Sequence, residues 1–179
     1  AVYEGQVTNG AREGEGTLSM PDGLIYAGLW KNGQIDGQGR LTQPNGDVYQ
    51  GDLVSGKRQG QGRVVYNNGD IYEGAFLDDR RHGEGSFVGT DGYRYEGDWA
   101  EGRISGQGRV TYPDGSIYEG SFADDLANGT GKITYPDGST YEGEWSNGVI
   151  DGEGVARYPN GLVYEGQFVN ARNEGFGIM

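Results

Sequence analysis

Apolar and polar residues alternate in short runs along this chain. In one run, Tyr141, Gly143 and Trp145 alternate with two glutamates, and in the next, Gly, Gly, Ala and Tyr occupy every other position from 152 to 158. A period of two is typical of a β-strand with one buried face. The pattern therefore predicts two strands joined by the polar segment 146–151, and no segment shows the period of a helix.

The pattern recurs every 23 residues without insertion or deletion, and each repeat begins at a tyrosine. These tyrosines are Tyr3, Tyr26, Tyr49, Tyr72, Tyr95, Tyr118, Tyr141 and Tyr164, and the last repeat is truncated. Each repeat predicts one β-hairpin, and turns such as Pro-Asp-Gly at 113–115 lead into the next. Because a single hairpin is marginally stable, neighbouring hairpins must stack. We predict an all-β fold: residues 1–179 form a single domain, an elongated, twisted single-layer array of tandem antiparallel β-hairpins.

The composition looks at first like that of a disordered chain. Of 179 residues, 37 are glycine, the mean hydropathy is -0.72 and the formal net charge is -13. Counted from the first tyrosine of each repeat, however, positions three, twelve and fourteen are always glycine, and the tryptophans all stand at position five. Glycines that share a face with aromatic residues leave space for rings to cover the sheet. The glycine content thus supports an ordered array.

The opposite face carries charge. Position two is glutamate in six repeats, and position fifteen is arginine or lysine in four. We interpret this face as solvated, with Glu–Arg pairs across strands, either within a repeat or between repeats. Exposed pairs of this kind contribute roughly 0–1 kcal/mol each.

The spacing Tyr-x-Gly-x-Trp-x-x-Gly-x-x-x-Gly-x-Gly resembles the MORN repeat (membrane occupation and recognition nexus), and residues 141–154 match it at every signature position. Asp79, Asp125 and Ala171 depart from the glycine of position eight, and Asp tolerates such turns better than most residues. The segment 89–92 lacks the usual Tyr-Pro, so we predict the weakest joint there. The resemblance implies an array of hairpins that serves as an attachment module for proteins or membranes.

Candidate chemistry is sparse. There is no cysteine, and His82, the single histidine, falls at a turn position, so the residues form no zinc or Cys-His constellation. The pairs Asp78-Asp79 and Asp124-Asp125 occupy equivalent turns, where a calcium site is the alternative to solvated turns. We predict a non-enzymatic protein with no catalytic residues, no metal site and no cofactor.

The charge also restricts the partners. A pI near 4.4 argues against nucleic acid and against adhesion to anionic lipid. No apolar run is long enough to span a membrane, and the first residues lack a signal-peptide pattern. The compartment stays open, with the cytoplasm as the expectation, and the chain is expected to be a fragment of a longer protein.

Three hypotheses for function follow. The first is a scaffold that binds a protein or peptide along an aromatic-glycine groove. The candidate groove residues are Trp30, Trp99, Trp145, Tyr112, Tyr135, Tyr158, Phe76 and Phe122. The second is self-association as an end-to-end homodimer, because an array of hairpins has open edges. The third is binding to phosphoinositide membranes through Lys57-Arg58 and Arg80-Arg81-His82, which the net charge disfavours.

Overall fold

The computed structural model describes residues 1–170 and 172–178 and divides into two compact units. We call them the N-terminal half, Ala1–Thr90, and the C-terminal half, Asp91–Met179. The division falls inside the segment 89–92, which lacks Tyr-Pro; a weaker joint there and a single domain over 1–179 stay predictions. Ala171 and the turn expected around it lie outside the described residues.

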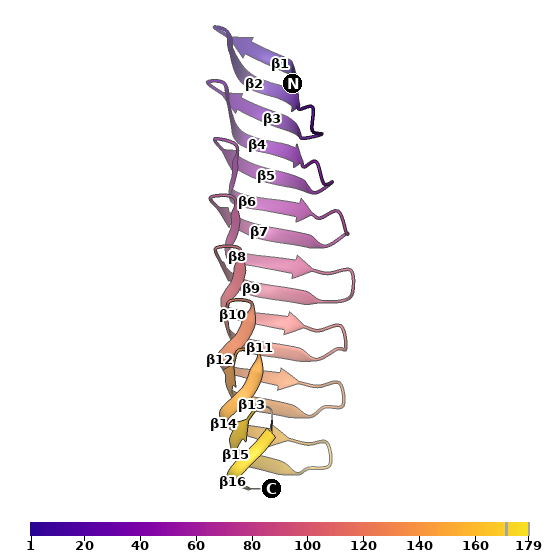
Figure 1. Cartoon of the computed structure of the whole chain (residues 1–179), viewed down its shortest axis with the longest axis vertical. Coiled ribbons are helices and arrows are strands. Elements are labelled where there is room, and N and C mark those ends of the chain that lie inside the picture. The colour runs from indigo at the N-terminus through magenta and orange to yellow at the C-terminus, as the bar shows by residue number, and fades with distance from the viewer. Residues whose placement is uncertain (171, 179) are drawn as a thin grey trace. The chain divides into compact units, whose positions relative to one another are not determined.

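Each half consists of eight strands, two to a repeat (Figure 1). In the N-terminal half they are β1 (Val2–Thr8), β2 (Ala11–Ser19), β3 (Ile25–Lys31), β4 (Gln34–Thr42), β5 (Val48–Val54), β6 (Lys57–Val65), β7 (Ile71–Leu77) and β8 (Arg80–Val88). In the C-terminal half they are β9 (Arg94–Ala100), β10 (Arg103–Thr111), β11 (Ile117–Ala123), β12 (Leu126–Thr134), β13 (Thr140–Ser146), β14 (Val149–Arg157), β15 (Val163–Val169) and β16 (Arg172–Ile178).

Within each half the strands pair with their neighbours in chain order, and every pair is antiparallel. Over the described residues the chain contains no helix, so none is present that could cross a membrane. The prediction of an all-β fold built from tandem hairpins in an open sheet is confirmed.

The turn inside each of the first seven hairpins spans two residues with positive φ. Asn32 and Gly33 have φ of 51° and 79°, and Asp78 and Asp79 have 47° and 72°. Two successive residues with positive φ give the tight hairpin turn whose twist matches that of the strands. The two aspartates therefore replace Asn-Gly without changing the turn, as expected for Asp at a left-handed position.

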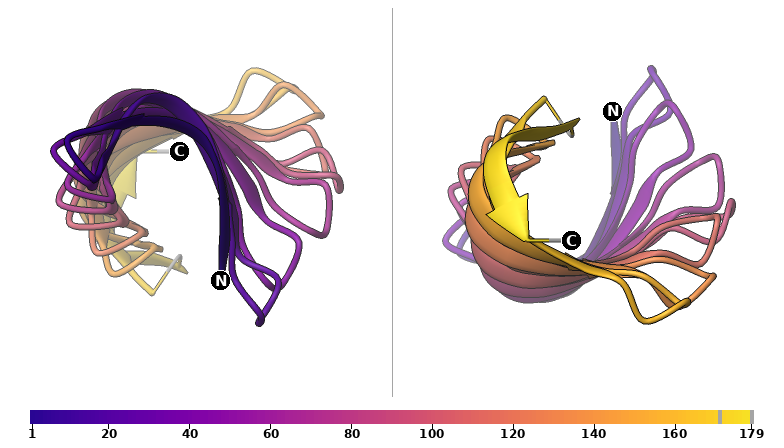
Figure 2. Two further views of the ribbon diagram at one scale, coloured as in Figure 1. Left: turned by 90° about the horizontal axis from the view of Figure 1, so that it is seen from above. Right: turned by 90° about the horizontal axis from the view of Figure 1, so that it is seen from below.

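A pair of facing glycines lets the sheet bend sharply in each of the first seven hairpins. Gly28 faces Gly39, and a Cβ added to Gly28 would lie 2.5 Å from the Gly39 Cα. A Cβ on Gly39 would lie 2.6 Å from the ring of Tyr26, so the ring covers this glycine directly. The Tyr26 hydroxyl reaches past the pair and donates a hydrogen bond to the Leu29 carbonyl at 2.7 Å. In Figure 2 the strands of each half accordingly follow an arc.

The core of each half is a column of perpendicular aromatic rings on this bent face. Tyr118 meets Phe122 of its own repeat at 5.0 Å between ring centroids and Trp145 of the next repeat also at 5.0 Å, both edge to face. Such pairs contribute about 0.5–1.5 kcal/mol beyond the burial of their area. Phe122 and Trp145 at position five therefore each stand against the tyrosines of two successive repeats, which joins these hairpins together.

The opposite face carries the charged pairs that the sequence predicts. Arg63 lies 3.8 Å from Glu73, and Arg109 lies 3.3 Å from Glu119. Both pairs join one repeat to the next, which settles the alternative that the sequence leaves open for these two arginines. All four side chains are largely exposed, so each pair contributes at most about 1 kcal/mol.

Candidate peptide-binding surface

The structure divides the predicted groove residues into two groups. Those at position five are buried: Trp30 (4% exposed), Phe76 (3%), Trp99 (5%), Phe122 (6%) and Trp145 (8%). The expectation that these rings are available for contact is wrong. Each packs edge to face against the tyrosine that begins its own repeat, and the Trp145 indole N–H already donates to the Gly131 carbonyl at 3.0 Å.

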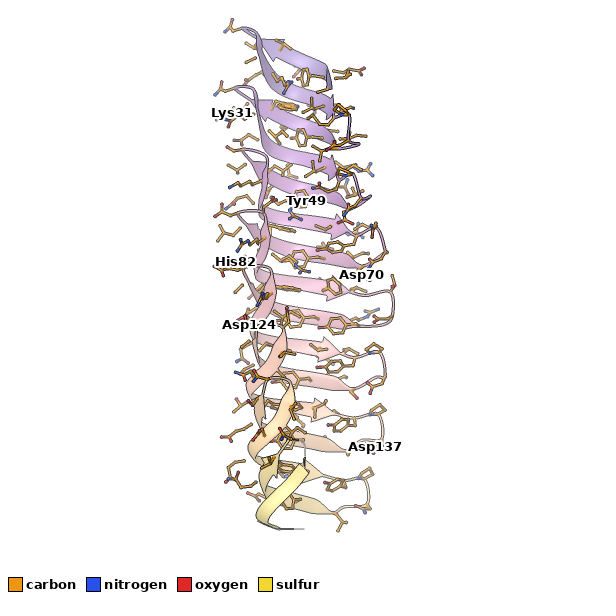
Figure 3. All side chains as sticks on the ribbon, viewed as in Figure 1. Lys31, Tyr49, Asp70, His82, Asp124 and Asp137 are labelled. Atoms are coloured by element: carbon orange, nitrogen blue, oxygen red, sulfur yellow. The ribbon has the colours of Figure 1, made fainter. Side chains whose placement is uncertain are left out.

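The remaining three candidates stay accessible. Tyr112 is half-buried, while Tyr135 and Tyr158 expose 36% and 37% of their surface. All three stand at position eighteen, at the ends of β10, β12 and β14, where the chain enters the turn to the next repeat. We call these side chains the tyrosine row. Asp137, labelled in Figure 3, marks the turn that follows Tyr135.

Backbone hydrogen bonds in the turns hold the residues of the tyrosine row in place. The Tyr112 carbonyl accepts a hydrogen bond from Gly115 at 2.9 Å, and the Tyr112 N–H donates to the Ser116 carbonyl at 2.8 Å. Pro at the second place of the turn and Gly at the fourth are the residues this geometry favours. Tyr135 and Tyr158 enter turns with equivalent hydrogen bonds, so the backbone holds the three residues in the same way.

The tyrosine hydroxyls of the row are available as donors. Over the part of the chain that the structure describes, no protein group is hydrogen-bonded to the hydroxyls of Tyr112, Tyr135 or Tyr158. In the pairing of β11 with β10 and β12, Ser116 lies between Tyr112 and Tyr135. Ser116 is 3% exposed, and its hydroxyl also has no hydrogen-bond partner among the described residues. The row therefore offers apolar ring faces together with polar groups that a ligand could satisfy.

The surroundings of the row are acidic. Burial raises the pKa of the Tyr112 and Tyr135 hydroxyls, and the charge of Asp114 acts in the same direction on both. Hydrogen bonds from Ser139 hold the pKa of Asp137 below its ordinary value, so this exposed carboxylate is ionised at neutral pH. The row thus combines protonated hydroxyls with negative charge.

The same register in the N-terminal half has another chemistry. Position eighteen is Met20, Gln43 and Tyr66, and Asp47 and Asp70 stand where the C-terminal half has Ser116 and Ser139. Here the carboxylates are used internally. Asp47 accepts from the Asn67 N–H at 2.8 Å and Asp70 from the Thr90 N–H at 3.0 Å, so each ties one turn to the next. Figure 3 labels Asp70 in its turn.

Arginines on the bent face also distinguish the N-terminal half. Arg58 pairs with Asp79 at 2.8 Å and lies 5.1 Å from the centre of the Phe76 ring. It lines a hollow of about 400 Å³ together with Asn45, Asp47 and Tyr49. A neighbouring hollow of about 300 Å³ is lined by residues that include Tyr66 and Arg81, and Arg81 lies over the Tyr72 ring at 5.8 Å.

From the sequence, Arg58 and Arg81 were considered only as parts of basic clusters for membrane binding, because position ten was not assigned to the buried face. In the hairpins it stands opposite position five, as in the pairs Trp99–Ile104 and Phe76–Arg81. Ile35, Ile104 and Ile150 at this position were the available signal: three isoleucines facing three tryptophans indicate one shared face.

The remaining candidates have structural roles. Asp79 binds Arg58, Asp124 lies 3.6 Å from Arg103, and Asp125 accepts from the Ile104 N–H at 2.8 Å. Among the described residues, no group of three or more His, Cys, Asp or Glu side chains could hold a metal ion. His82 lies in β8 next to the hairpin turn, where Figure 3 labels it.

Fold and site together define a tandem-repeat protein with an open aromatic surface. The chain belongs to the MORN-repeat family, whose model matches residues 3–25, 26–48, 49–71, 72–92, 95–117, 118–140, 141–163 and 164–179. The identification made from the spacing of residues is confirmed. No curated protein sequence matches the chain.

Solved structures with a similar fold include the TCP and TCP10 domains of two CPAP proteins. The SAS-4 (dCPAP) TCP domain of Drosophila melanogaster, solved in complex with a proline-rich motif of Ana2 (dSTIL), has a TM-score of 0.51 at 16% identity, over 87% of this chain and 85% of that one. The wild-type TCP10 domain of Danio rerio CPAP has a TM-score of 0.44 at 16% identity, over 89% and 85%.

Proposed function

We propose that this chain is a non-enzymatic attachment module that binds a peptide segment of another protein on the bent aromatic face of its repeats. The observation that carries the proposal is the tyrosine row: three rings in equivalent settings, accessible, with hydroxyls that no protein group satisfies. Tyrosine supplies a large contact area at little cost in conformational entropy and is enriched among residues that dominate binding energy.

Of the eight groove residues that we predict from the sequence, only three accordingly remain as contact residues. Tyr112, Tyr135 and Tyr158 are the contact residues that we propose, and the five buried rings belong to the core. The Drosophila TCP domain, which has a related fold and was solved with a peptide motif, supports a peptide as the partner.

The two alternative functions have weaker support. Arg58, which belongs to the basic cluster considered for phosphoinositide binding, is engaged by Asp79 and packed on Phe76, so its charge is partly used inside the fold. End-to-end self-association stays a prediction that rests on open sheet edges alone.

The test is an unbiased display of random linear peptides selected on the purified chain. Enriched peptides are then measured against the variant Tyr112→Ser, Tyr135→Ser and Tyr158→Ser. A matched control is Leu126→Ser with Val149→Ser, which removes exposed apolar side chains of the same half on the opposite face.

We expect the enriched peptides to bind the parent and the control alike and to lose about tenfold or more in affinity for the tyrosine variant, a difference of about 1.4 kcal/mol. Equal binding to both variants, or a selection without enrichment, would overturn the proposal. Circular dichroism checks that each variant keeps the β fold.

A further inference from the structure

We propose that the partner of the tyrosine row is a basic, proline-rich segment in the polyproline II conformation, with a proline at every third position, running across the strands of the C-terminal half. The inference rests on the proposed peptide-binding function and specifies the chemistry of its ligand. Two observations carry it: the spacing of Tyr112, Tyr135 and Tyr158 along the sheet and the acidic groups beside them.

The spacing of the row matches the period of a polyproline II helix. Successive tyrosines of the row stand at the ends of β10, β12 and β14, so each is two strands from the next. At about 4.8 Å between neighbouring strands, the step is about 9.6 Å. A polyproline II helix rises about 3.1 Å per residue with three residues per turn, so equivalent side chains recur every ~9.3 Å on one face.

Other peptide conformations match the step less well. In an α-helix, side chains seven residues apart return to nearly the same face after about 10.5 Å, which exceeds the step by about 0.9 Å at each repeat. An extended strand covers about 9.9 Å in three residues, but its side chains alternate, so the third residue points away. Only the polyproline II period keeps both distance and face, with a mismatch of about 0.3 Å per repeat.

The chemistry of the row suits the same ligand. Proline-rich segments dock on aromatic surfaces, and their preformed conformation lowers the entropy lost on binding. A polyproline II backbone makes no internal hydrogen bonds, so its carbonyls can accept from the unpartnered hydroxyls of the row. The row thus supplies what this conformation leaves unsatisfied: apolar faces for the proline rings and donors for the carbonyls.

The acidic groups beside the tyrosine row favour basic residues between the prolines of the ligand. Asp114 and Asp137 are exposed in the turns that follow Tyr112 and Tyr135, and both carboxylates act on the Tyr135 hydroxyl, which places them beside the row. The chain as a whole carries a formal net charge of -13. Arginine or lysine beside the prolines would complement these groups, whereas acidic residues would be repelled.

The N-terminal half lacks this combination and serves as an internal comparison. Its position eighteen has only one tyrosine, Tyr66, and the carboxylates of Asp47 and Asp70 are used to tie successive turns together. Its bent face also carries Arg58 and Arg81, which would oppose a basic ligand. The proposed ligand is therefore specific to the C-terminal half.

The test uses labelled synthetic peptides and the whole chain, with affinity measured by fluorescence anisotropy. The probe repeats Pro-Arg-Ala over about twelve residues, which at ~3.1 Å per residue crosses all three tyrosines. One comparison peptide has the same composition with its prolines out of the three-residue period, one has glutamate for arginine, and one is an amphipathic helix with leucine every seventh residue.

We expect the Pro-Arg-Ala peptide to bind about tenfold more tightly than the peptide with displaced prolines, and the glutamate peptide not to bind. Tyr135→Ala should weaken the probe about tenfold, Tyr135→Phe much less, and Asp114→Asn with Asp137→Asn should reduce both affinity and its salt dependence. The control Leu126→Ser with Val149→Ser should bind like the parent, and Tyr66→Ala should have no effect.

Failure of this inference differs from failure of the proposed function. If the helical peptide, or displayed peptides without the three-residue proline period, bind through the tyrosine row while Pro-Arg-Ala does not, the polyproline II ligand is overturned and peptide binding stands. If Pro-Arg-Ala binds equally after the tyrosine substitutions, the row is not its site and the inference falls. If no peptide depends on the row, both proposals fail.

Discussion

The two halves of this protein share one frame and differ in what they present on it. Both have the facing glycines, the tyrosine that covers them and the two-residue turn with positive φ. In the N-terminal half, Leu53 interrupts the aromatic column, and position ten is Arg12, Ile35, Arg58 and Arg81. In the C-terminal half the column of rings continues from Tyr95 to Tyr164 and position ten is Ile104, Ala127 and Ile150.

Comparison of the two halves indicates which positions of the repeat maintain the fold and which are free to vary. The facing glycines and the tyrosine that covers them are the same in both halves. They lie directly against backbone, so any added atom would collide. Positions at the edge of the bent face vary, because they meet solvent or a neighbouring turn. We therefore expect function at positions ten and eighteen of the repeat and at position twenty-two, where Asp47, Asp70, Ser116 and Ser139 stand.

The largest expected effect is unfolding of both halves at high pH, because both contain buried tyrosines at position one of the repeat. Burial raises the pKa of the Tyr49, Tyr72, Tyr118 and Tyr141 hydroxyls to about 12. Because the folded pKa exceeds that of the unfolded chain, near 10, the stability from these groups is intact below pH 10 and is lost between about pH 10 and 12. Circular dichroism and tyrosinate absorbance should change together in that window. Ionisation of these tyrosines near pH 10 with the fold retained would contradict the burial described.

A methyl group at the glycine pair should destabilise either half by about the same amount. In Gly131→Ala the new Cβ would lie 2.2 Å from the Tyr118 hydroxyl, and in Gly62→Ala 2.2 Å from the Tyr49 ring. Overpacking of this kind costs about 3 kcal/mol, read from denaturant unfolding. Thr130→Ala, next to Gly131 and exposed, should stay within about 0.5 kcal/mol of the parent. Unequal losses for the two glycines would show that the frame is not shared.

Shortening the aromatic column of the C-terminal half sharpens the comparison. Phe122→Leu makes this position like Leu53 and removes edge-to-face contacts with Tyr95 and Tyr118. We expect a loss of about 2 kcal/mol, from two ring contacts of about 0.5–1.5 kcal/mol each. Thermal and denaturant unfolding measure it. A loss below about 0.5 kcal/mol would mean that the unbroken column adds nothing over leucine.

The smallest effect concerns position ten of the N-terminal half. Arg58→Ile converts it to the residue type of the C-terminal half. Burial alone would raise the pKa of Asp79, but the hydrogen bonds and charge of Arg58 hold it below its ordinary value. This contribution is present above pH 4 and is lost as the pH falls through the lowered pKa of the folded state. We expect a change of at most about 1 kcal/mol at pH 7, and a weaker loss of stability in acid than in the parent. An unchanged acid profile would show that Arg58 does not control Asp79.

Much of this architecture could be read from the residues. The interval between Tyr26 and Tyr49 gives the repeat, the alternation around Tyr141 gives the strands, and the fixed glycines give the face on which the rings lie. These features repeat many times, so chance alternation is averaged out. The site was less accessible to such reasoning: Trp99 and Tyr112 both look like exposed aromatic contacts in a sequence, and their burial depends on which neighbours enclose them.

From the residues alone the hairpins, the repeat and the family could be determined, because each follows from local periodicity and from positions that only glycine or a turn-forming residue can occupy. The tertiary structure decided which rings are core and which are surface, because a ring at position five is enclosed by tyrosines of two successive repeats, whereas a ring at position eighteen stands at a turn. The stacking of hairpins also brought Arg58 to Asp79, 21 residues away, and placed Asp114 near enough to Tyr135 of the next repeat to raise the pKa of its hydroxyl.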